Sequence, residues 1–342
     1  MNKILISVVE KDNVLRFTSD DNSQKDFEIE GENGKRTIIK DNQIYYLIED
    51  SLLAFERIKV GNFKHCIFLC DILFEGQNFY ETPDFSHTIF TKNANFKKTT
   101  FTKNADFLNA VFTQGANFKD AIFTKNANFL SAIFTKNANF FSATFTQNAD
   151  FYDATFNQDS DFGNTKIQGI LNFTKVKKIK LDLQLAIVDR IEYGNTEFTS
   201  DNRETLLILK NVALKQNDQI RALEFHQQEY RTHFKNIKLG GDKLILGFEY
   251  WASNFGTSAI VATSRFIGVI MLFYILINGF EGDVKTIIDF ILPTSYDIDS
   301  IFKNYIFNIQ QCDRWLFLIY KTLQLIMIYE IIKSFRKFSR QL

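Results

Sequence analysis

The chain has 342 residues, which is enough for two or three domains. Its 40 basic residues balance its 40 acidic residues, and this neutrality excludes a general phosphate binder and an overall acidic mimic of nucleic acid. Three cysteines are too few for a disulfide framework, which indicates a reducing compartment. The chain contains 38 Phe against 2 Pro, so we expect the aromatic side chains to stack in an ordered core.

Residues 1–60 alternate between apolar and polar positions and predict a domain of short β-strands that caps the central part of the chain. The expected strands cover residues 3–9, 13–18, 26–30, 36–40 and 43–48. The apolar run at residues 4–9 is shorter than the roughly 7 to 15 residues of a secretory signal, which places the N-terminus in the cytoplasm.

The centre of the chain is an internal repeat. Steps of five and six residues, taken alternately from Phe63 to Phe173, pass through 21 positions, of which 20 are Phe and one is Ile167. Ala stands two residues before most of these positions, and side chains two apart share a face only in extended backbone. We therefore expect a coiled β-structure whose core includes Phe96, Phe107, Phe118, Phe129, Phe140, Phe151, Ala94, Ala105, Ala127 and Ala149.

The triplets at residues 94–96, 105–107, 127–129 and 149–151 each combine Ala, then Asn or Asp, then Phe. This unit resembles that of the pentapeptide-repeat proteins, and the resemblance implies a right-handed quadrilateral β-helix with four faces per coil. One extra residue in every second unit gives 22 residues per coil. The 110 residues from Phe63 to Phe173, divided by 22, then predict five coils within residues 61–175.

Residues 176–250 are expected to form a helical linker with an αα-hairpin that starts at Asp201 or Asn202 and is interrupted at residues 216–218. The sequence of residues 203–211 and 222–229 resembles that of the linker in bacterial inner-membrane proteins that carry pentapeptide repeats and a C-terminal pair of membrane helices. The fold class expected from the whole chain is therefore mainly β, with helices toward the C-terminus.

Residues 251–342 are expected to form a membrane region with two transmembrane helices, at about 258–280 and 314–333. Basic residues precede the first helix and follow the second, whereas the segment between them is acidic. This distribution predicts that both termini face the cytoplasm. Charges within the two segments, at Arg265 and Lys321, are the candidates for a membrane-linked function, although both could reach the interface by snorkelling.

The sequence carries no nucleotide-binding, nucleophile-elbow or kinase motif, so we expect no enzymatic activity and no cofactor. His226, Glu229 and His233 have helical spacing typical of metal ligands, but no further His or Cys accompanies them, so no metal site is expected. The segment between Phe63 and Phe173 contains ten acidic residues and nine lysines. Its net charge is therefore too small for a mimic of duplex DNA.

We therefore expect a non-enzymatic scaffold or protein-interaction platform, anchored in a bacterial-type inner membrane and presenting a cytoplasmic β-solenoid. Its expected partners are the lipid bilayer, a protein that the sequence cannot name and further copies of itself, with no nucleic acid. One alternative is an oligomeric two-helix channel or transporter regulated by the solenoid. A less favoured one is a DNA-mimic inhibitor of a topoisomerase.

Overall fold

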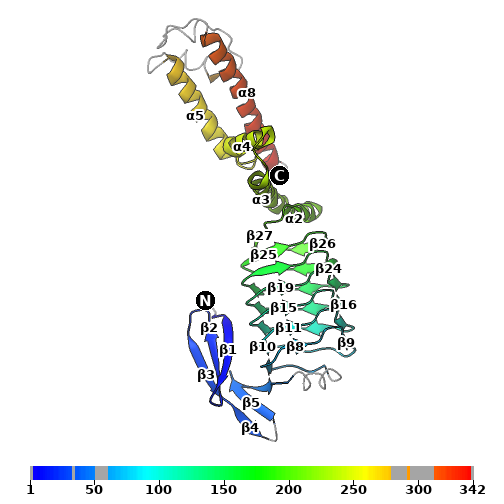
Figure 1. Cartoon of the computed structure of the whole chain (residues 1–342). Helices are drawn as coiled ribbons and strands as arrows, with labels where there is room; N and C mark the ends of the chain where they lie inside the picture. The colour runs from blue at the N-terminus through cyan, green and yellow to red at the C-terminus, as the bar shows by residue number, and fades with distance from the viewer. Residues whose placement is uncertain (1–2, 33–34, 51–60, 279–290, 293–311, 340–342) are drawn as a thin grey trace. The chain divides into compact units, whose positions relative to one another are not determined.

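A computed structural model describes residues 3–32, 35–50, 61–278, 291–292 and 312–339 (Figure 1). The chain divides into two compact units, residues 1–222 and residues 223–342. The first, called the solenoid unit, holds all the described strands and the first helix. The second, called the helical unit, contains most of α3 and the helices that follow it.

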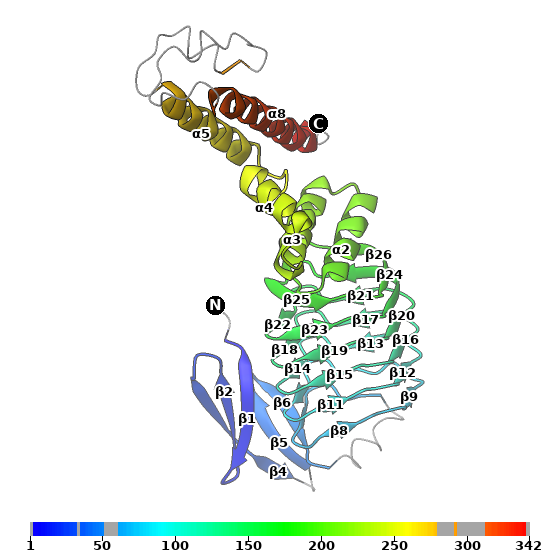
Figure 2. The same ribbon diagram turned by 45° about the horizontal axis from the view of Figure 1, so that its top comes forward.

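The centre of the solenoid unit is a coil with four faces, on which short strands stack in parallel (Figure 2). One face contains β7 (Cys66–Phe68), β10 (Ile89–Phe90), β14 (Val111–Phe112), β18 (Ile133–Phe134) and β22 (Thr155–Phe156). The next contains β8 (Ile72–Leu73), β11 (Ala94–Asn95), β15 (Ala116–Asn117), β19 (Ala138–Asn139), β23 (Asp159–Asp161), β25 (Lys178–Asp182) and β27 (Glu197–Thr199).

The two remaining faces share one sheet. It contains β9 (Asn78–Phe79), β12 (Thr100–Phe101), β16 (Ile122–Phe123) and β20 (Thr144–Phe145) on one side, and β13 (Ala105–Asp106), β17 (Ala127–Asn128) and β21 (Ala149–Asp150) on the other. The longer β24 (Lys166–Asn172) pairs with both β20 and β21, and β26 (Ile187–Glu192) pairs with β24.

The Phe side chains fill the interior as four columns. Phe129 stacks on Phe107 and Phe151 with ring centroids 4.7 and 4.8 Å apart, and it meets Phe118 and Phe140 edge-to-face at 5.5 Å. All six predicted core Phe are fully buried, and the four predicted core Ala are at most 1% exposed. Burial of each Phe contributes roughly 1.5 to 3 kcal/mol, which makes this core the main source of stability in the unit.

The polar residues of the repeat satisfy the backbone at the corners. The Asn or Asp before an inward Phe accepts a hydrogen bond from the amide two residues later, as from Leu108 N to Asp106 Oδ1 at 3.0 Å. The Thr after an inward Phe donates its hydroxyl to the Phe carbonyl one coil earlier, as from Thr135 to Phe112 at 2.8 Å. The Asn-Phe and Phe-Thr pairs of the sequence therefore close the corners that a coiled strand requires.

The solenoid has about seven turns, so the prediction of five was too low. The two further levels are marked by β25 and β27 and lie in residues 176–199, which the sequence assigned to the helical linker. There the inward positions hold aliphatic residues such as Leu181 and Val188, and the spacing shortens, with Ser160 paired to Leu181 and Ile179 to Phe198. A frame of Phe at a fixed period of 22 residues cannot detect these turns.

The N-terminal strands extend and cover the first coil. They are β1 (Leu5–Lys11), β2 (Val14–Ser19), β3 (Gln24–Glu28), β4 (Glu30–Glu32), β5 (Lys35–Lys40) and β6 (Gln43–Ile48). Strands β1 to β3 form an antiparallel sheet, whereas β6 pairs in parallel with β7, placing Ile48 beside Phe68. β6 therefore occupies the position of a preceding coil and protects the backbone edge of β7.

At the other end, α2 (Arg203–Lys215) packs on the last coil, with Asn202 as its N-cap. Leu206 and Leu209 are fully buried there. Beyond the helix, the Gln216 side chain accepts from Ile191 N at 3.0 Å and donates to Ile191 O at 2.9 Å. It thus replaces a paired strand at the open edge of β26.

The helical unit contains most of α3 (Gln219–Asn236), then α4 (Gly241–Ser253), α5 (Ala259–Asn278) and α8 (Cys312–Ser339). The break between α2 and α3 lies at residues 216–218, where the sequence predicts it. The two segments predicted as transmembrane helices correspond to α5 and α8, which lie side by side in both views (Figures 1 and 2).

The prediction that these helices span a membrane is not supported: in the described part of the chain, none is long and apolar enough to do so. Arg265 interrupts the apolar sequence of α5, and Lys321, Gln324 and Glu330 interrupt that of α8. Most of the acidic segment predicted between the two helices lies outside the described residues.

Candidate functional site

The pair formed by α5 and α8 distributes its side chains in the opposite way to an ordinary soluble helix pair. On α8, the polar residues Gln324 and Glu330 are 0% and 4% exposed. On the outer surfaces, Met271 of α5 and Leu325 of α8 are each 60% exposed. Soluble proteins normally expose their polar side chains and bury the apolar ones, so this helix pair departs from the usual pattern.

The apolar outer surface runs along both helices. It includes Ile260, Ile267, Met271, Leu272 and Ile275 of α5, and Leu318, Ile319, Leu325, Ile326, Tyr329, Ile332 and Phe335 of α8, and we call these residues the apolar surface. A hollow of about 340 Å³ interrupts it and is lined only by apolar and aromatic residues, among them Phe266, Ile270 and Tyr274.

A polar cluster joins α4 to α8 within the helical unit, and two of its four side chains are buried whereas the other two are about a quarter exposed. Its members are Glu249, Ser253, Glu330 and Lys333. Ser253 donates its hydroxyl to Glu330 Oε2 at 2.6 Å, and Lys333 Nζ donates to Glu249 Oε1 at 2.8 Å and to Glu330 Oε1 at 3.4 Å. Because each charge has an opposite charge beside it, the cluster can be buried without an isolated ion.

The connection between α4 and α5 supports this cluster. Asn254 ends α4 in the left-handed conformation, and Gly256 follows with a φ of +68°. The amide of Gly256 donates to Ser253 Oγ at 2.7 Å, so that hydroxyl is oriented toward Glu330. A Cβ at position 256 would lie 3.2 Å from the side chain of Lys333, and the positive φ also disfavours other residues. Both explain why Gly stands at this position.

The two predicted membrane-functional residues do not form one site. Arg265 lies over the Trp251 ring at 5.7 Å and donates to the Tyr250 carbonyl, both on α4. Lys321 is only 8% exposed and donates to the carbonyl of Leu292 at 2.7 Å. Each residue therefore connects its helix to a different neighbouring segment, and a membrane-linked function of either one stays a prediction.

The sequence analysis did not predict the polar cluster, although it noted charges in the same segments. In the sequence, Glu330 and Lys333 only interrupt or end an apolar run, whereas Glu249 and Ser253 belong to the approach to the first predicted span. Only the pairing of α4 with α8 brings residues about 80 positions apart into contact. The detectable signal was that Glu330, Lys333 and Ser334 fall within about one helical turn and so share one side of the helix.

His226 and Glu229, whose spacing in the sequence is typical of metal ligands, lie one turn apart on α3. His226 Nδ1 is 3.9 Å from Glu229 Oε2. Glu229 is 1% exposed and Tyr230 packs on the His226 ring at 4.5 Å. Across the described ranges, no group of three or more His, Cys, Asp or Glu side chains could hold a metal ion.

Comparison with known proteins identifies the coiled region. The family profile described as "Pentapeptide repeats (9 copies)" matches residues 74–122, 96–144 and 118–166. Residues 74–166 are pentapeptide repeats. β-Solenoids of such repeats are generally structural or interaction proteins rather than enzymes. No curated protein and no solved structure matches the chain.

Proposed function

We propose that the chain is a non-enzymatic, membrane-anchored platform on which the pentapeptide-repeat solenoid is presented to a protein partner. The apolar surface of α5 and α8 contacts the lipid, and the polar cluster remains inside the helical unit. The proposal rests on one observation about this helix pair. The apolar side chains of Met271 and Leu325 are each 60% exposed, whereas the charged Glu330 is only 4% exposed.

The pairing of the two helices reconciles this proposal with their individual sequences. Counted alone, α8 contains the polar residues Lys321, Gln324 and Glu330, which lower its mean hydropathy. In the pair, these side chains point inward and bond to protein groups, as Gln324 Nε2 does to the Ile291 carbonyl at 2.6 Å. Polar groups of membrane-embedded helices characteristically face the interior of the bundle and pair there.

The distribution of basic residues supports a location at the cytoplasmic side of a bacterial-type inner membrane. Lys333, Arg336, Lys337 and Arg340 follow the apolar part of the C-terminal helix, and Arg231, Lys235, Lys238 and Lys243 precede α5. Under the positive-inside rule, both ends of the chain then face the cytoplasm. The solenoid unit would lie in the same compartment, because it precedes α5 in the chain.

Fractionation of the native host tests the anchor. We expect the full-length chain in the membrane fraction, resistant to high salt and released by detergent. Met271→Lys places a charge on the apolar surface and should cost about 2.5–3.5 kcal/mol of insertion, which moves most of the protein out of that fraction. Ile187→Lys on the solenoid changes an equally exposed residue, at 60%, and is the matched control.

Two results would contradict the anchor. One is full-length protein in the soluble fraction, and the other is equal behaviour of the Met271→Lys and Ile187→Lys proteins. The partner is tested separately, by crosslinking with mass spectrometry. We expect links from exposed solenoid lysines such as Lys103 and Lys125 to a second protein, and links only within the chain would argue against a platform.

An oligomeric channel uses the same helices, so it needs its own test. The contacts of Lys321 with Leu292 and of Glu330 with Ser253 and Lys333 favour a structural role for the charges on α8. We therefore expect no ion flux through liposomes that contain the purified protein. A flux that Lys321→Met abolishes would replace the platform with a channel.

A further inference from the structure

One outer face of the solenoid carries apolar residues at four successive positions where the opposite face carries mostly polar ones. The residue just before the inward Phe is Ile67, Ile89, Val111 or Ile133 on β7, β10, β14 and β18, and parallel pairing stacks them in register. At the same place on β9, β12, β16 and β20 stand Asn78, Thr100, Ile122 and Thr144. We call the first set the apolar column.

The N-terminal sheet covers part of the apolar column. Ile67 and Ile89 are 0% and 4% exposed because they share a core with Phe17, Phe27 and Tyr45. Val111 packs at the margin of that core. Ile133, one coil further, remains half-buried. An antiparallel sheet that packs on one face explains why this column alone is apolar.

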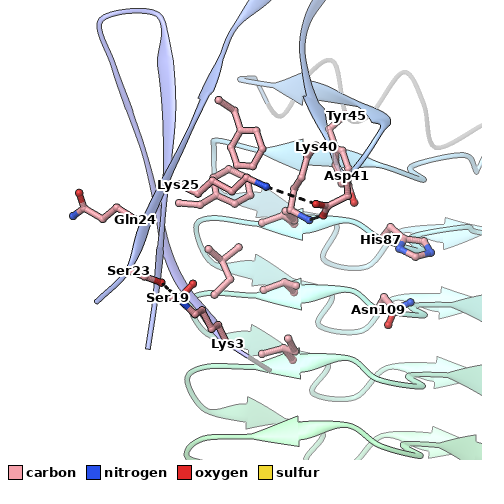
Figure 3. A pocket seen from close by; sticks show the side chains of 16 residues that line it. Lys3, Ser19, Ser23, Gln24, Lys25, Lys40, Asp41, Tyr45, His87 and Asn109 are labelled. Carbon is pink, nitrogen blue, oxygen red and sulfur yellow. Dashed lines mark hydrogen bonds and ion pairs between the residues drawn. The ribbon is translucent and has the colours of Figure 1, made fainter. Parts of the chain in front are cut away.

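The contact between the N-terminal sheet and the column leaves a groove of about 550 Å³ (Figure 3). Ile89, Val111 and Ile133 line it on the solenoid side, and Leu5, Phe17 and Phe27 line it on the other. This volume lies in the range of small-molecule sites, roughly 300–1,000 Å³, which are typically apolar with a few polar groups.

Charged groups gather at one end of the groove. Figure 3 shows Lys25 and Lys40 converging on Asp41, with Tyr45 beside them. Lys40 bonds to Asp41 Oδ2, and Lys25 Nζ lies 3.8 Å from Oδ1. The bond from Lys40 holds the pKa of Asp41 below its usual range, so the carboxylate is ionised at neutral pH. One carboxylate thus faces two ammonium groups.

The other end of the groove holds a third lysine. Lys3 lines it together with Ser19 and Ser23, and Figure 3 shows these three side chains close together. Lys3 Nζ is paired with Asp21 at 2.9 Å, so its charge is balanced. Among the residues that line the groove, three are Lys and one is Asp. The uncompensated positive charge therefore lies at the end that holds Lys25 and Lys40.

We propose that this groove binds a small amphipathic anion, a hydrocarbon or aromatic body that carries one carboxylate. The carboxylate binds Lys25 and Lys40, in competition with Asp41, and the body lies along Ile89, Val111 and Ile133. The apolar walls contribute through removal of hydrocarbon from water, and the ammonium groups select the charged end. This site belongs to the solenoid unit and does not depend on the membrane anchor.

Octanoate is the probe for this site, with 1-octanol as the uncharged analogue of equal chain length and acetate as the charge without a chain. Saturation-transfer NMR on the full-length protein in detergent solution measures each dissociation constant. Val111→Trp fills the groove and supplies the background from binding elsewhere. We expect octanoate to bind at least tenfold more tightly than either analogue, and this binding to vanish in the Val111→Trp protein.

Charge variants then locate the carboxylate. Lys25→Glu should weaken octanoate binding at least tenfold, whereas Lys103→Glu, at an exposed position that does not line the groove, should leave it unchanged. Hydrogen exchange in β10 and β14 checks that all variants remain folded. Equal binding of octanoate and 1-octanol, equal effects of the two charge variants, or tighter binding of an apolar-ended peptide would overturn the proposal.

Discussion

The solenoid unit and the helical unit arrange polar and apolar side chains in opposite ways. The solenoid buries columns of Phe, with Phe129 fully enclosed, and exposes Asn and Lys at its corners. The pair of α5 and α8 buries Gln324 and Glu330 and exposes Met271 and Leu325. The comparison shows why the membrane anchor is proposed for the helical unit alone, since exposed side chains normally suit the medium around them.

The largest effect is expected from the aromatic core. Phe129→Ala removes a ring that contacts Phe107, Phe151 and their neighbours and should destabilise the solenoid by about 3–5 kcal/mol. Phe141→Ala is the matched control, because Phe141 is 36% exposed and points outward. Chemical denaturation followed by circular dichroism measures both. Equal losses of stability would show that the stacked columns do not hold the coil together.

The polar interior of the helical unit should matter less than that core but still measurably. Ser253→Ala removes the donor to Glu330 Oε2 and leaves a buried carboxylate short of one bond, at a cost of about 1.5–3 kcal/mol. Ser264→Ala removes a hydroxyl that bonds to the nearby Val261 carbonyl on an exposed surface. Thermal unfolding of the reconstituted protein compares them, and a control that costs as much would refute a structural polar cluster.

A smaller loss of stability is expected from a substitution at the open edge of the solenoid. Gln216→Ala removes both hydrogen bonds to Ile191 and should cost about 1 kcal/mol, with faster hydrogen exchange in β26. Lys215→Ala next to it breaks only a surface pair with Asp189 and should change nothing measurable. If exchange in β26 does not respond to Gln216→Ala, the side chain does not act as the missing strand.

The smallest effect concerns pH. His65 and His87 stack at 4.9 Å in the first coils, and burial, the main cause, lowers the pKa of both imidazoles. When the pKa of a histidine is lower in the folded protein than its unfolded value of about 6.5, the protein loses stability as the pH falls through 6.5. The reason is that the unfolded chain binds the protons first. The loss ends once the pH is below the folded pKa.

Replacement by Asn isolates this contribution. His65 and His87 have positive φ, as does Asn109 at the equivalent position of the next coil, so Asn fits the backbone there. The double variant His65→Asn, His87→Asn should show a flatter dependence of stability on pH between 7 and 5. An unchanged slope would assign the dependence to other groups.

The repeat was predictable because its information is local. Phe at alternate steps of five and six, with Ala two positions earlier, specifies extended segments, corners and an aromatic interior without reference to distant residues. The last two turns were missed because Leu181, Val188 and Ile191 fill the same slots at shorter spacing. A search for any apolar residue at a period of 19–22 could have found them.

The groove and the polar cluster could not be derived in the same way. Both depend on contacts between segments that are far apart in sequence, the N-terminal strands with β14 and β18 for the groove and α4 with α8 for the cluster. The apolar column was visible as Ile89, Val111 and Ile133 at a spacing of 22, yet outward positions were expected to be solvated. Apolar residues repeated on one face alone are the signal that another element covers that face.

Spin labels test the contrast between the two units most directly. In full-length protein without its native cysteines, reconstituted in liposomes, Met271→Cys and Leu185→Cys would each carry one label. Leu185 is 65% exposed on the solenoid, so both sites are open in the isolated chain. We predict high accessibility to oxygen and low accessibility to a water-soluble nickel complex at position 271, and the reverse at 185. High accessibility to nickel at both positions would contradict the account.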